Sequence, residues 1–192
     1  MKPRIQVKRS VRACSFILFA ALTFLGTANA AQLFLVANVA GTVVSQKDSG
    51  QLADFTASKW FPRNARVSTR ARSGVEALSP GLFLRFGENT TFSFGEDHLQ
   101  LSEGAVLVRL LGTGKDLAVQ GPDANLTIKG EGALMLEVPP GGGLKLIGLT
   151  GKPSLSSDPL ATQIELVPGQ ALLAKPRGAG WSKPLHVNLA KL

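Results

Sequence analysis

Few side chains in this sequence could carry out chemistry. Its 192 residues include two histidines, one cysteine and no tyrosine. His98 directly follows Glu96 and Asp97, and an imidazole beside carboxylates is a ligand set that several metal ions accept. The same three residues also suit a solvated turn, in which acidic side chains face water. We favour the turn, and we therefore expect no bound metal and no cofactor.

The other candidate catalytic groups lack partners nearby in the sequence. His186 stands alone near the end of the chain. Glu131 and Glu137 lie six residues apart and would share one face of a continuous strand, as a carboxylate pair for glycoside hydrolysis would require, although Gly132 favours a bulge between them. The stretch 112–115, Gly-Thr-Gly-Lys, lacks the spacing of a phosphate-binding loop and indicates a turn. We predict no catalytic residues and no enzymatic activity, and we keep a hydrolase as a remaining alternative.

A run of cations is the clearest charge feature. No acidic residue occurs from Phe55 to Val75, whereas five basic residues do: Lys59, Arg63, Arg66, Arg70 and Arg72. Such a segment could bind an anionic partner, for example a polysaccharide, a lipid headgroup or an acidic protein face. The alternative is that the charges keep an edge strand soluble and unpaired. Our candidate partner-binding residues from this run are Arg63, Arg66, Arg70 and Arg72.

The second tryptophan, Trp181, is a further candidate contact residue. It lies between Gly180 and Ser182, in a stretch rich in glycine and proline that runs from Lys175 to Lys183. Glycine and proline break regular structure, so we expect Trp181 to be partly exposed.

The first 30 residues have the three parts of a secretory signal peptide. Five basic residues precede an apolar stretch, Ala13 to Leu25, and Ala28 and Ala30 form a small-residue cleavage site before Ala31. An uncleaved anchor is the alternative, but the apolar stretch is shorter than the roughly 20 residues that span a bilayer. We therefore expect a periplasmic or secreted bacterial protein.

Removal of the signal changes the charge and the cysteine count. Five of the 21 basic residues and none of the 13 acidic residues precede Ala31, which leaves 16 against 13. This small excess does not predict nucleic-acid binding. The single cysteine, Cys14, lies within the signal, so the mature chain has neither a disulfide nor a thiolate metal site.

The rest of the sequence predicts short strands separated by turns. Apolar residues alternate at Leu82, Leu84 and Phe86 and again at Phe92 and Phe94, which is typical of strands with one buried face. Turn residues recur every eight to twelve positions, as in sandwiches and barrels. We predict an all-β fold, either a single antiparallel sandwich or jelly-roll-like domain or a rolled, solenoid-like β domain. We place this domain at residues 31–175 and an exposed C-terminal tail at residues 176–192.

The stretch from Ala124 to Ser156 gives the most definite local prediction. It contains three apolar runs, Leu126–Ile128, Ala133–Val138 and Leu144–Leu149. Two prolines and three glycines separate the last two runs, and these residues cannot continue a helix or a central strand. We therefore predict a β-hairpin here.

Taken in order, these elements resemble the FecR-like domain, a β-rich periplasmic module first known from iron-transport regulators. The family pattern contains a glycine-valine strand, a tryptophan, and the segments V-x-T-x-x-x-S, N-T-x-F-x-F, L-x-L-x-x-G-x-V and L-x-P-G-Q. The resemblance covers Val39 to Ala174, and the matching residues are Gly41-Thr42-Val43, Trp60, Val67, Thr69, Ser73, Asn89-Thr90-Thr91-Phe92-Ser93-Phe94, Leu99, Leu101, Gly104, Val106 and Leu166-Val167-Pro168-Gly169-Gln170.

The resemblance implies a core position for Trp60, in preference to a carbohydrate-binding platform. The sequence departs from the family after Pro122-Asp123-Ala124, where an Arg-Gly-Thr element is missing. Family members that regulate sigma factors usually carry an N-terminal cytoplasmic segment and a membrane helix. This sequence begins with a signal peptide instead, so we expect no direct transmembrane signalling.

The resemblance and the absence of converging chemistry together predict the function. We expect an exported, non-enzymatic FecR-like protein that acts as a protein-interaction or sensing module in the cell envelope. The alternative is a carbohydrate-binding or structural envelope protein. The expected partner is another envelope protein or an anionic glycan, not a nucleic acid, and membrane contact would come only through an uncleaved signal.

Overall fold

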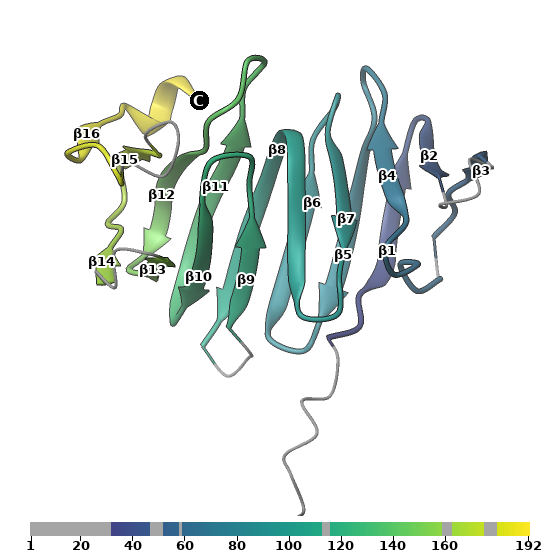
Figure 1. Cartoon of the computed structure of the whole chain (residues 1–192), viewed down its shortest axis with the longest axis horizontal. Helices are drawn as coiled ribbons and strands as arrows, with labels where there is room; N and C mark the ends of the chain where they lie inside the picture. Colours follow the sequence, from purple (N-terminus) through teal and green to yellow (C-terminus); the bar gives the residue numbers. More distant parts are fainter. Residues whose placement is uncertain (1–31, 47–51, 58, 113–115, 159–162, 175–179) are drawn as a thin grey trace, which may run out of the picture. The chain divides into compact units, whose positions relative to one another are not determined.

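Alternating apolar residues form the strands and give each of them a buried side. In β6 (Leu82–Phe86), Leu82, Leu84 and Phe86 are buried, whereas Arg85 between them is exposed. Successive side chains of a strand point to opposite faces, so this repeat turns one face towards a core. Nearly all regular structure is of this kind, and the predicted all-β fold is confirmed (Figure 1).

The computed structural model describes residues 32–46, 52–57, 59–112, 116–158, 163–174 and 180–192, all within one compact unit, Gln32–Leu192. The predicted signal peptide with its cleavage residues Ala28, Ala30 and Ala31 lies outside the described residues, as do residues 113–115 of the predicted turn. Within the described ranges, no helix has both the length and the apolar character needed to cross a membrane.

The strands form two sheets, which we name sheet A and sheet B. In spatial order, sheet A contains β1 (Leu35–Ala40), β5 (Gly74–Ser79), β6, the second half of β8 (His98–Leu111), β11 (Glu131–Val138), β12 (Lys145–Gly151), β15 (Gln170–Leu173) and β16 (Leu185–His186). Sheet B contains β3 (Leu52–Asp54), β2 (Val43–Gln46), β4 (Arg66–Thr69), β7 (Thr91–Phe94), the first half of β8, β9 (Leu117–Gln120), β10 (Asn125–Lys129), β13 (Ser154–Asp158) and β14 (Gln163–Glu165). All these pairs are antiparallel except β8 with β9.

Strand β8 joins the two sheets because it bends at Gly104. Its first half pairs with β7 in sheet B, and its second half pairs with β6 and β11 in sheet A. Gly104 has a φ of 89°, a conformation that favours glycine. The buried positions change from Leu99 and Leu101 to Val106 and Val108 across this bend. The sheets are therefore one surface folded over a common core, which agrees with a sandwich or rolled β domain.

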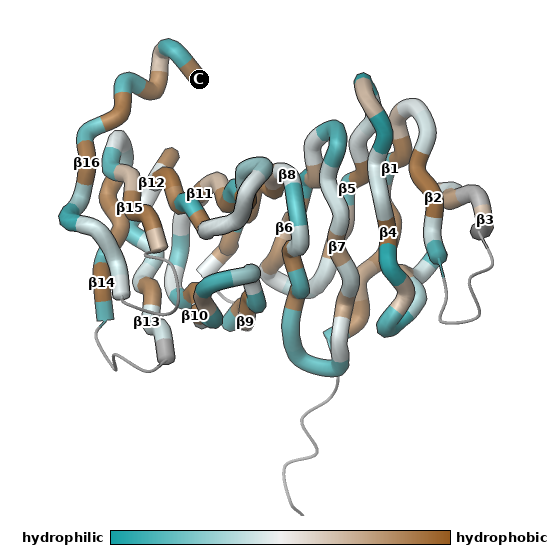
Figure 2. Tube along the Cα trace, turned by 45° about the horizontal axis from the view of Figure 1, so that its top comes forward, coloured by the Kyte–Doolittle hydropathy of each residue, from teal (hydrophilic) through white to brown (hydrophobic). Residues whose placement is uncertain are grey.

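Aromatic rings from the two sheets meet in that core. Phe86 of sheet A stacks on Phe92 of sheet B, with ring centroids 3.6 Å apart and ring planes at 4°. Phe34, which precedes β1, stacks on Phe94 in the same way at 4.2 Å. Hydrophobic residues recur along the strands of both layers in Figure 2. Burial of several such rings is a large stabilising contribution, because each buried aromatic side chain removes about 150–250 Å² of surface from water.

The predicted hairpin between Ala124 and Ser156 is confirmed for its second and third runs. β11 and β12 pair antiparallel from Gly132–Gly151 to Glu137–Lys145. The first run belongs elsewhere, because β10 pairs with β9 and β13 in sheet B. Gly130, with a φ of 87°, lies where the chain leaves one sheet for the other.

The last described residues attach to the edge of sheet A. Residues Gln170 and Ala171 of β15 pair with β16, and the backbone N–H of Val187 donates to the carbonyl oxygen of Gly169 at 2.8 Å. A short 3-10 helix, η2 (Leu189–Lys191), follows. Most side chains from Lys183 onwards are exposed.

Candidate interaction surface

The arginines of the predicted partner-binding segment lie along β4. Arg66 and Arg70 point outwards from sheet B because Val67 and Thr69 between them are buried in the core. β4 pairs with β2 on one side and β7 on the other, so these arginines stand on the face of the sheet. At about 3.3 Å per residue, the two Cα atoms are roughly 13 Å apart.

Arg63 and Arg72 extend this line beyond both ends of β4. Arg63 forms a bridge with Phe94 of β7, and Arg72 lies in the turn before β5. We call Arg63, Arg66, Arg70 and Arg72 the arginine row. All four are exposed, and the structure spreads them along the sheet instead of gathering them at one point.

The arginine row has no ionic partner in the part of the chain that the structure describes. The ion pairs of lysine and arginine there lie on other strands: Arg85–Glu76, Lys129–Asp116 and Lys145–Glu137. Unpaired cations on β4 and the segments that flank it give a positive strip that attracts anions. Whether the row binds a partner stays a prediction.

The predicted core position of Trp60 is wrong. Trp60 is 60% exposed, and the neighbouring Phe61 is buried instead, with its ring 5.0 Å from that of Phe94. The segment pairs with the chain around β1: the N–H of Val36 donates to the carbonyl of Lys59, and the N–H of Phe61 donates to the carbonyl of Phe34. This extended pairing turns adjacent side chains to opposite faces, so only one of the two aromatics can enter the core.

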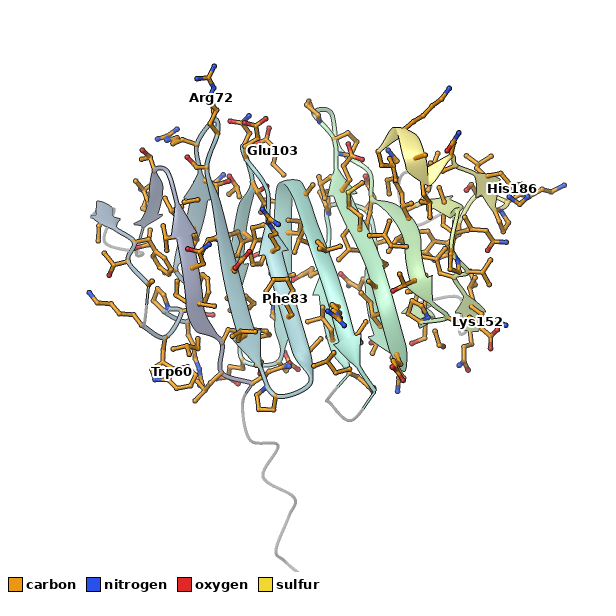
Figure 3. The ribbon with its side chains drawn as sticks, turned by 180° about the vertical axis from the view of Figure 1, so that it is seen from behind. Trp60, Arg72, Phe83, Glu103, Lys152 and His186 are labelled. Carbon is orange, nitrogen blue, oxygen red and sulfur yellow. The ribbon has the colours of Figure 1, made fainter. Side chains whose placement is uncertain are left out.

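Trp181 is partly buried. It forms a bridge with Ala174 and packs against the core, and the N–H of Ser182 donates to the carbonyl of Leu173 at 2.8 Å. The prediction of partial exposure agrees with this position. Trp60 therefore offers more free aromatic surface than Trp181 does. In Figure 3, Trp60 lies at the lower edge of the sheets and Arg72 at the upper edge.

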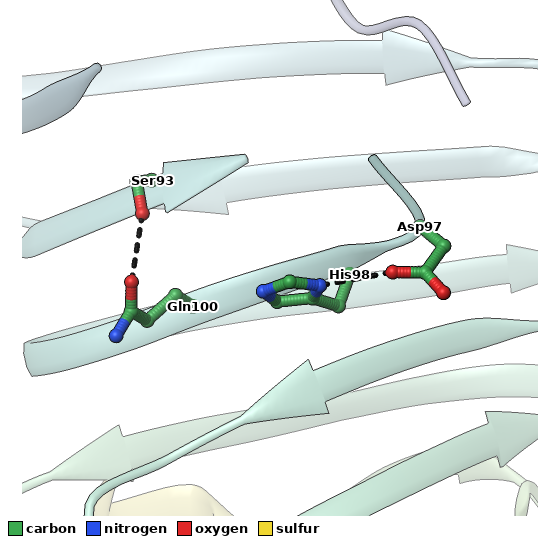
Figure 4. Close-up of polar contacts among 4 residues, drawn as sticks. All are labelled: Ser93, Asp97, His98 and Gln100. Carbon is green, nitrogen blue, oxygen red and sulfur yellow. Dashed lines mark hydrogen bonds and ion pairs between the residues drawn. The ribbon is translucent and has the colours of Figure 1, made fainter. Parts of the chain in front are cut away.

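His98 and Asp97 form an isolated pair (Figure 4). The ring nitrogen Nδ1 of His98 lies 3.0 Å from Oδ1 of Asp97. Since an ionised carboxylate only accepts hydrogen bonds, Nδ1 is the donor. This bond lowers the pKa of Asp97 below its ordinary value. Among the described residues, no group of three or more histidine, cysteine, aspartate or glutamate side chains is arranged to hold a metal ion.

The formal carboxylate pair, Glu131 and Glu137, is not a catalytic pair. Both face outwards from β11, as their spacing predicts. Six residues of strand separate their Cα atoms by roughly 20 Å, whereas glycosidase carboxylates lie about 5 to 9.5 Å apart. Glu137 forms an ion pair with Lys145, with Oε2 2.8 Å from Nζ. His186 lies on the exposed strand β16.

A polar groove that the sequence does not reveal crosses the outer face of sheet B. One row of residues in register runs over β8, β9, β10 and β13: His98, Ala118, Thr127 and Ser156. Gln120 and Asn125 stand in the next row. These residues line a groove of about 330 Å³. Apolar residues such as Val119 and Leu126 share the lining with amide, hydroxyl and imidazole groups, and such neutral hydrogen-bonding groups suit hydroxyl groups better than ions.

Comparison with known proteins supports the fold. No protein-family model matches the chain, and no curated protein matches it significantly. The structure is similar to two crystal structures of a putative anti-sigma factor from Parabacteroides distasonis ATCC 8503. One has a TM-score of 0.50 with 13% identity and the other a TM-score of 0.49 with 14% identity, and each match covers 66% of this chain and 61% of the other. The chain described here thus has a β fold like that of the Parabacteroides distasonis structure with the TM-score of 0.50. It spans less than two thirds of the length of that other chain.

Proposed function

We propose that this chain is an exported, non-enzymatic FecR-like protein that acts as an interaction or sensing module in the bacterial cell envelope. The observation that carries the proposal is the arginine row. Arg66 and Arg70 project from the face of sheet B, and no ion pair among the described residues neutralises them. Guanidinium groups bind carboxylates and phosphates in a bidentate manner. The partner is therefore anionic, either an acidic surface of another envelope protein or an anionic glycan.

The regulatory part of the proposal rests on analogy. The similar solved structure carries the name of a putative anti-sigma factor, and a shared fold alone does not transfer a function. The FecR-like motifs favour the same role, and the predicted N-terminal signal favours a periplasmic or secreted location.

A pull-down from periplasmic extract tests this proposal. A variant with glutamine at Arg63, Arg66, Arg70 and Arg72 should recover much less of the partner than the unchanged protein. The matched control carries glutamine at Arg109, on β8, and at Lys152, between β12 and β13, both exposed and outside the arginine row, and should recover the partner. Added salt at about 1 M shortens the Debye length to about 3 Å and should release the partner. Equal recovery by the arginine-row variant would remove the row from the proposal.

The groove on sheet B supports a second candidate, a carbohydrate-binding envelope protein. Gln120, Asn125 and Thr127 present neutral donors and acceptors on adjacent strands, as recognition of sugar hydroxyls requires. Co-sedimentation with peptidoglycan or an exported polysaccharide is the test, with Asn125→Ala and Gln120→Ala as variants. Binding through neutral groups should persist at high salt, in contrast to binding by the arginine row. Failure to co-sediment would exclude this candidate.

A further inference from the structure

A second cleft lies on the outer face of sheet A, beside β1, β5 and β6. Arg72, at the upper edge of the sheets in Figure 3, is one of its lining residues. Its volume is about 340 Å³. Its floor has almost no side chains, because Ala40 pairs with Gly74 and Gly87 follows β6. A Cβ atom at Gly74 would approach the carbonyl oxygen of Phe86 to 2.9 Å. Gly74 is therefore explained by the close approach of the neighbouring β6 backbone, and together with Gly87 it leaves few side chains on the floor of the cleft.

One wall of the cleft is a row of three polar side chains. Asn38 of β1, Glu76 of β5 and Arg85 of β6 lie opposite one another in the sheet. A bulge between Val36 and Asn38 sets this row, because a regular register would place Ala37 opposite Glu76. Bulges often redirect side chains next to functional sites. Nε of Arg85 lies 3.6 Å from Oε1 of Glu76, so this wall presents a cation beside an anion.

The other wall comes from two turns. Arg72 lies in a turn closed by a hydrogen bond from the N–H of Ser73 to the carbonyl oxygen of Arg70, at 3.2 Å. Oε2 of Glu88 accepts a hydrogen bond from the backbone N–H of Arg72 at 2.6 Å, which fixes the turn. The guanidinium group of Arg72 has no ion pair within the described residues. This wall also presents both signs of charge.

The backbone of Arg72 is strained. Its φ is 56°, a region that glycine and asparagine enter easily and that other residues avoid. Strained residues persist where the surrounding structure holds them, and they gather at ligand-binding sites. The positive φ of Arg72 therefore adds to the case for a functional role of this turn, beside the charged walls of the cleft and the bulge at Asn38.

We propose that this cleft binds a small zwitterion, either a free amino acid or a short peptide with free termini. The guanidinium of Arg72 binds the carboxylate of the ligand, and the carboxylates of Glu76 and Glu88 bind its ammonium group. Two arginines and two glutamates line the cleft. The two glutamates would repel a ligand that carries only negative charge, and the two arginines would repel a ligand that carries only positive charge. The exposed side chain of Arg72 extends beyond the strands in Figure 3, and it can fold over the floor because exposed rotamers change within nanoseconds.

Titration of the isotopically labelled protein with four alanine compounds, followed by NMR, tests this proposal. Alanine and alanyl-alanine carry both charges, whereas N-acetylalanine has only the carboxylate and alanine amide only the ammonium group. The amide signals of Gly74, Glu76 and Gly87 should shift with a zwitterion and not with either singly charged compound. Alanine and alanyl-alanine distinguish a free amino acid from a peptide. No shift with either zwitterion, or equal binding of N-acetylalanine, would overturn the proposal.

Variants separate this cleft from the arginine row. Arg72→Gln and Glu88→Gln should each weaken zwitterion binding about tenfold, the effect of losing one charge-assisted hydrogen bond. Arg109→Gln removes an exposed arginine from the same sheet outside the cleft and should change nothing. Arg66→Gln should leave zwitterion binding intact, although it weakens capture of an anionic partner. Unchanged binding by Arg72→Gln would contradict the proposal, whatever the outcome of the pull-down.

Discussion

The backbone N–H of Thr90 donates a hydrogen bond to the side-chain oxygen of Thr69, 2.8 Å away, and both residues are buried. The same hydroxyl group donates to the carbonyl oxygen of Gly87 at 2.6 Å. The hydroxyl oxygen of Thr90 in turn accepts from the N–H of Ala105, directly after the bend at Gly104. Residues that match the FecR-like motifs thus connect β4, β7 and β8 where the chain passes between the sheets. Their role in this molecule is to hold the fold.

Loss of the Thr69 hydroxyl should destabilise the protein. Thr69→Val keeps the shape of the side chain and leaves the buried N–H of Thr90 without an acceptor. A buried polar group that loses its partner costs about 1–3 kcal/mol. Chemical denaturation of the variant should show this loss in the free energy of unfolding. Ser93→Ala is the control, because its bond to Gln100 is exposed, and it should stay within about 0.5 kcal/mol. Equal stability of both variants would contradict the role of Thr69.

Two glycines with nearly the same φ should respond differently to alanine. A Cβ at Gly104 would collide with the Cα of Thr90 and the carbonyl oxygen of Asn89, both backbone atoms, whereas at Gly130 nothing lies within 4 Å. Gly130→Ala should cost only the backbone strain, about 1–2 kcal/mol. Gly104→Ala adds the steric overlap, for about 2–5 kcal/mol in all. Thermal unfolding of both variants measures the difference, and a similar loss in each would show that the bend tolerates a side chain.

The sequence reveals much of the β structure because burial follows a simple alternation. Leu82, Leu84 and Phe86 identify their strand and its inner face without any other information. The prediction fails at Trp60, since two adjacent aromatics in a short segment do not reveal which one faces the core. Hydrogen bonds to β1 decide that question in favour of Phe61.

The groove on sheet B and the cleft on sheet A depend on strand register, which the pattern of residues does not specify. Asn38, Glu76 and Arg85 come together through the pairing of three strands and a bulge. β10 and β11 follow each other in the sequence, yet they lie in different sheets. Local turn signals predict that the chain changes direction at such points. They do not predict which strand becomes the next neighbour.

The pair formed by Asp97 and His98 should show a specific pH dependence. The hydrogen bond from His98 lowers the pKa of Asp97 in the folded protein. A lowered pKa means that this contribution to stability is present at neutral pH and is lost as the pH falls through the folded pKa. Carboxyl NMR of Asp97 should give a midpoint below that of a model aspartate. In His98→Ala the midpoint should return to the ordinary value, and an unchanged midpoint would show that the bond does not form in solution.

Relief of the strain at Arg72 should stabilise the protein. Arg72→Gly removes a side chain from a backbone with a φ of 56°, a conformation that costs other residues about 1–2 kcal/mol. Glycine gains extra freedom in the unfolded chain, which offsets about 0.5–1 kcal/mol of that relief. The free energy of unfolding should therefore rise by up to about 1.5 kcal/mol in chemical denaturation. Arg70→Gly is the matched control, because Arg70 is not among the residues with positive φ, and it should lower stability. A destabilised Arg72→Gly variant would mean that contacts of the arginine side chain outweigh the strain, whereas a more stable one indicates that the arginine is retained for what it binds.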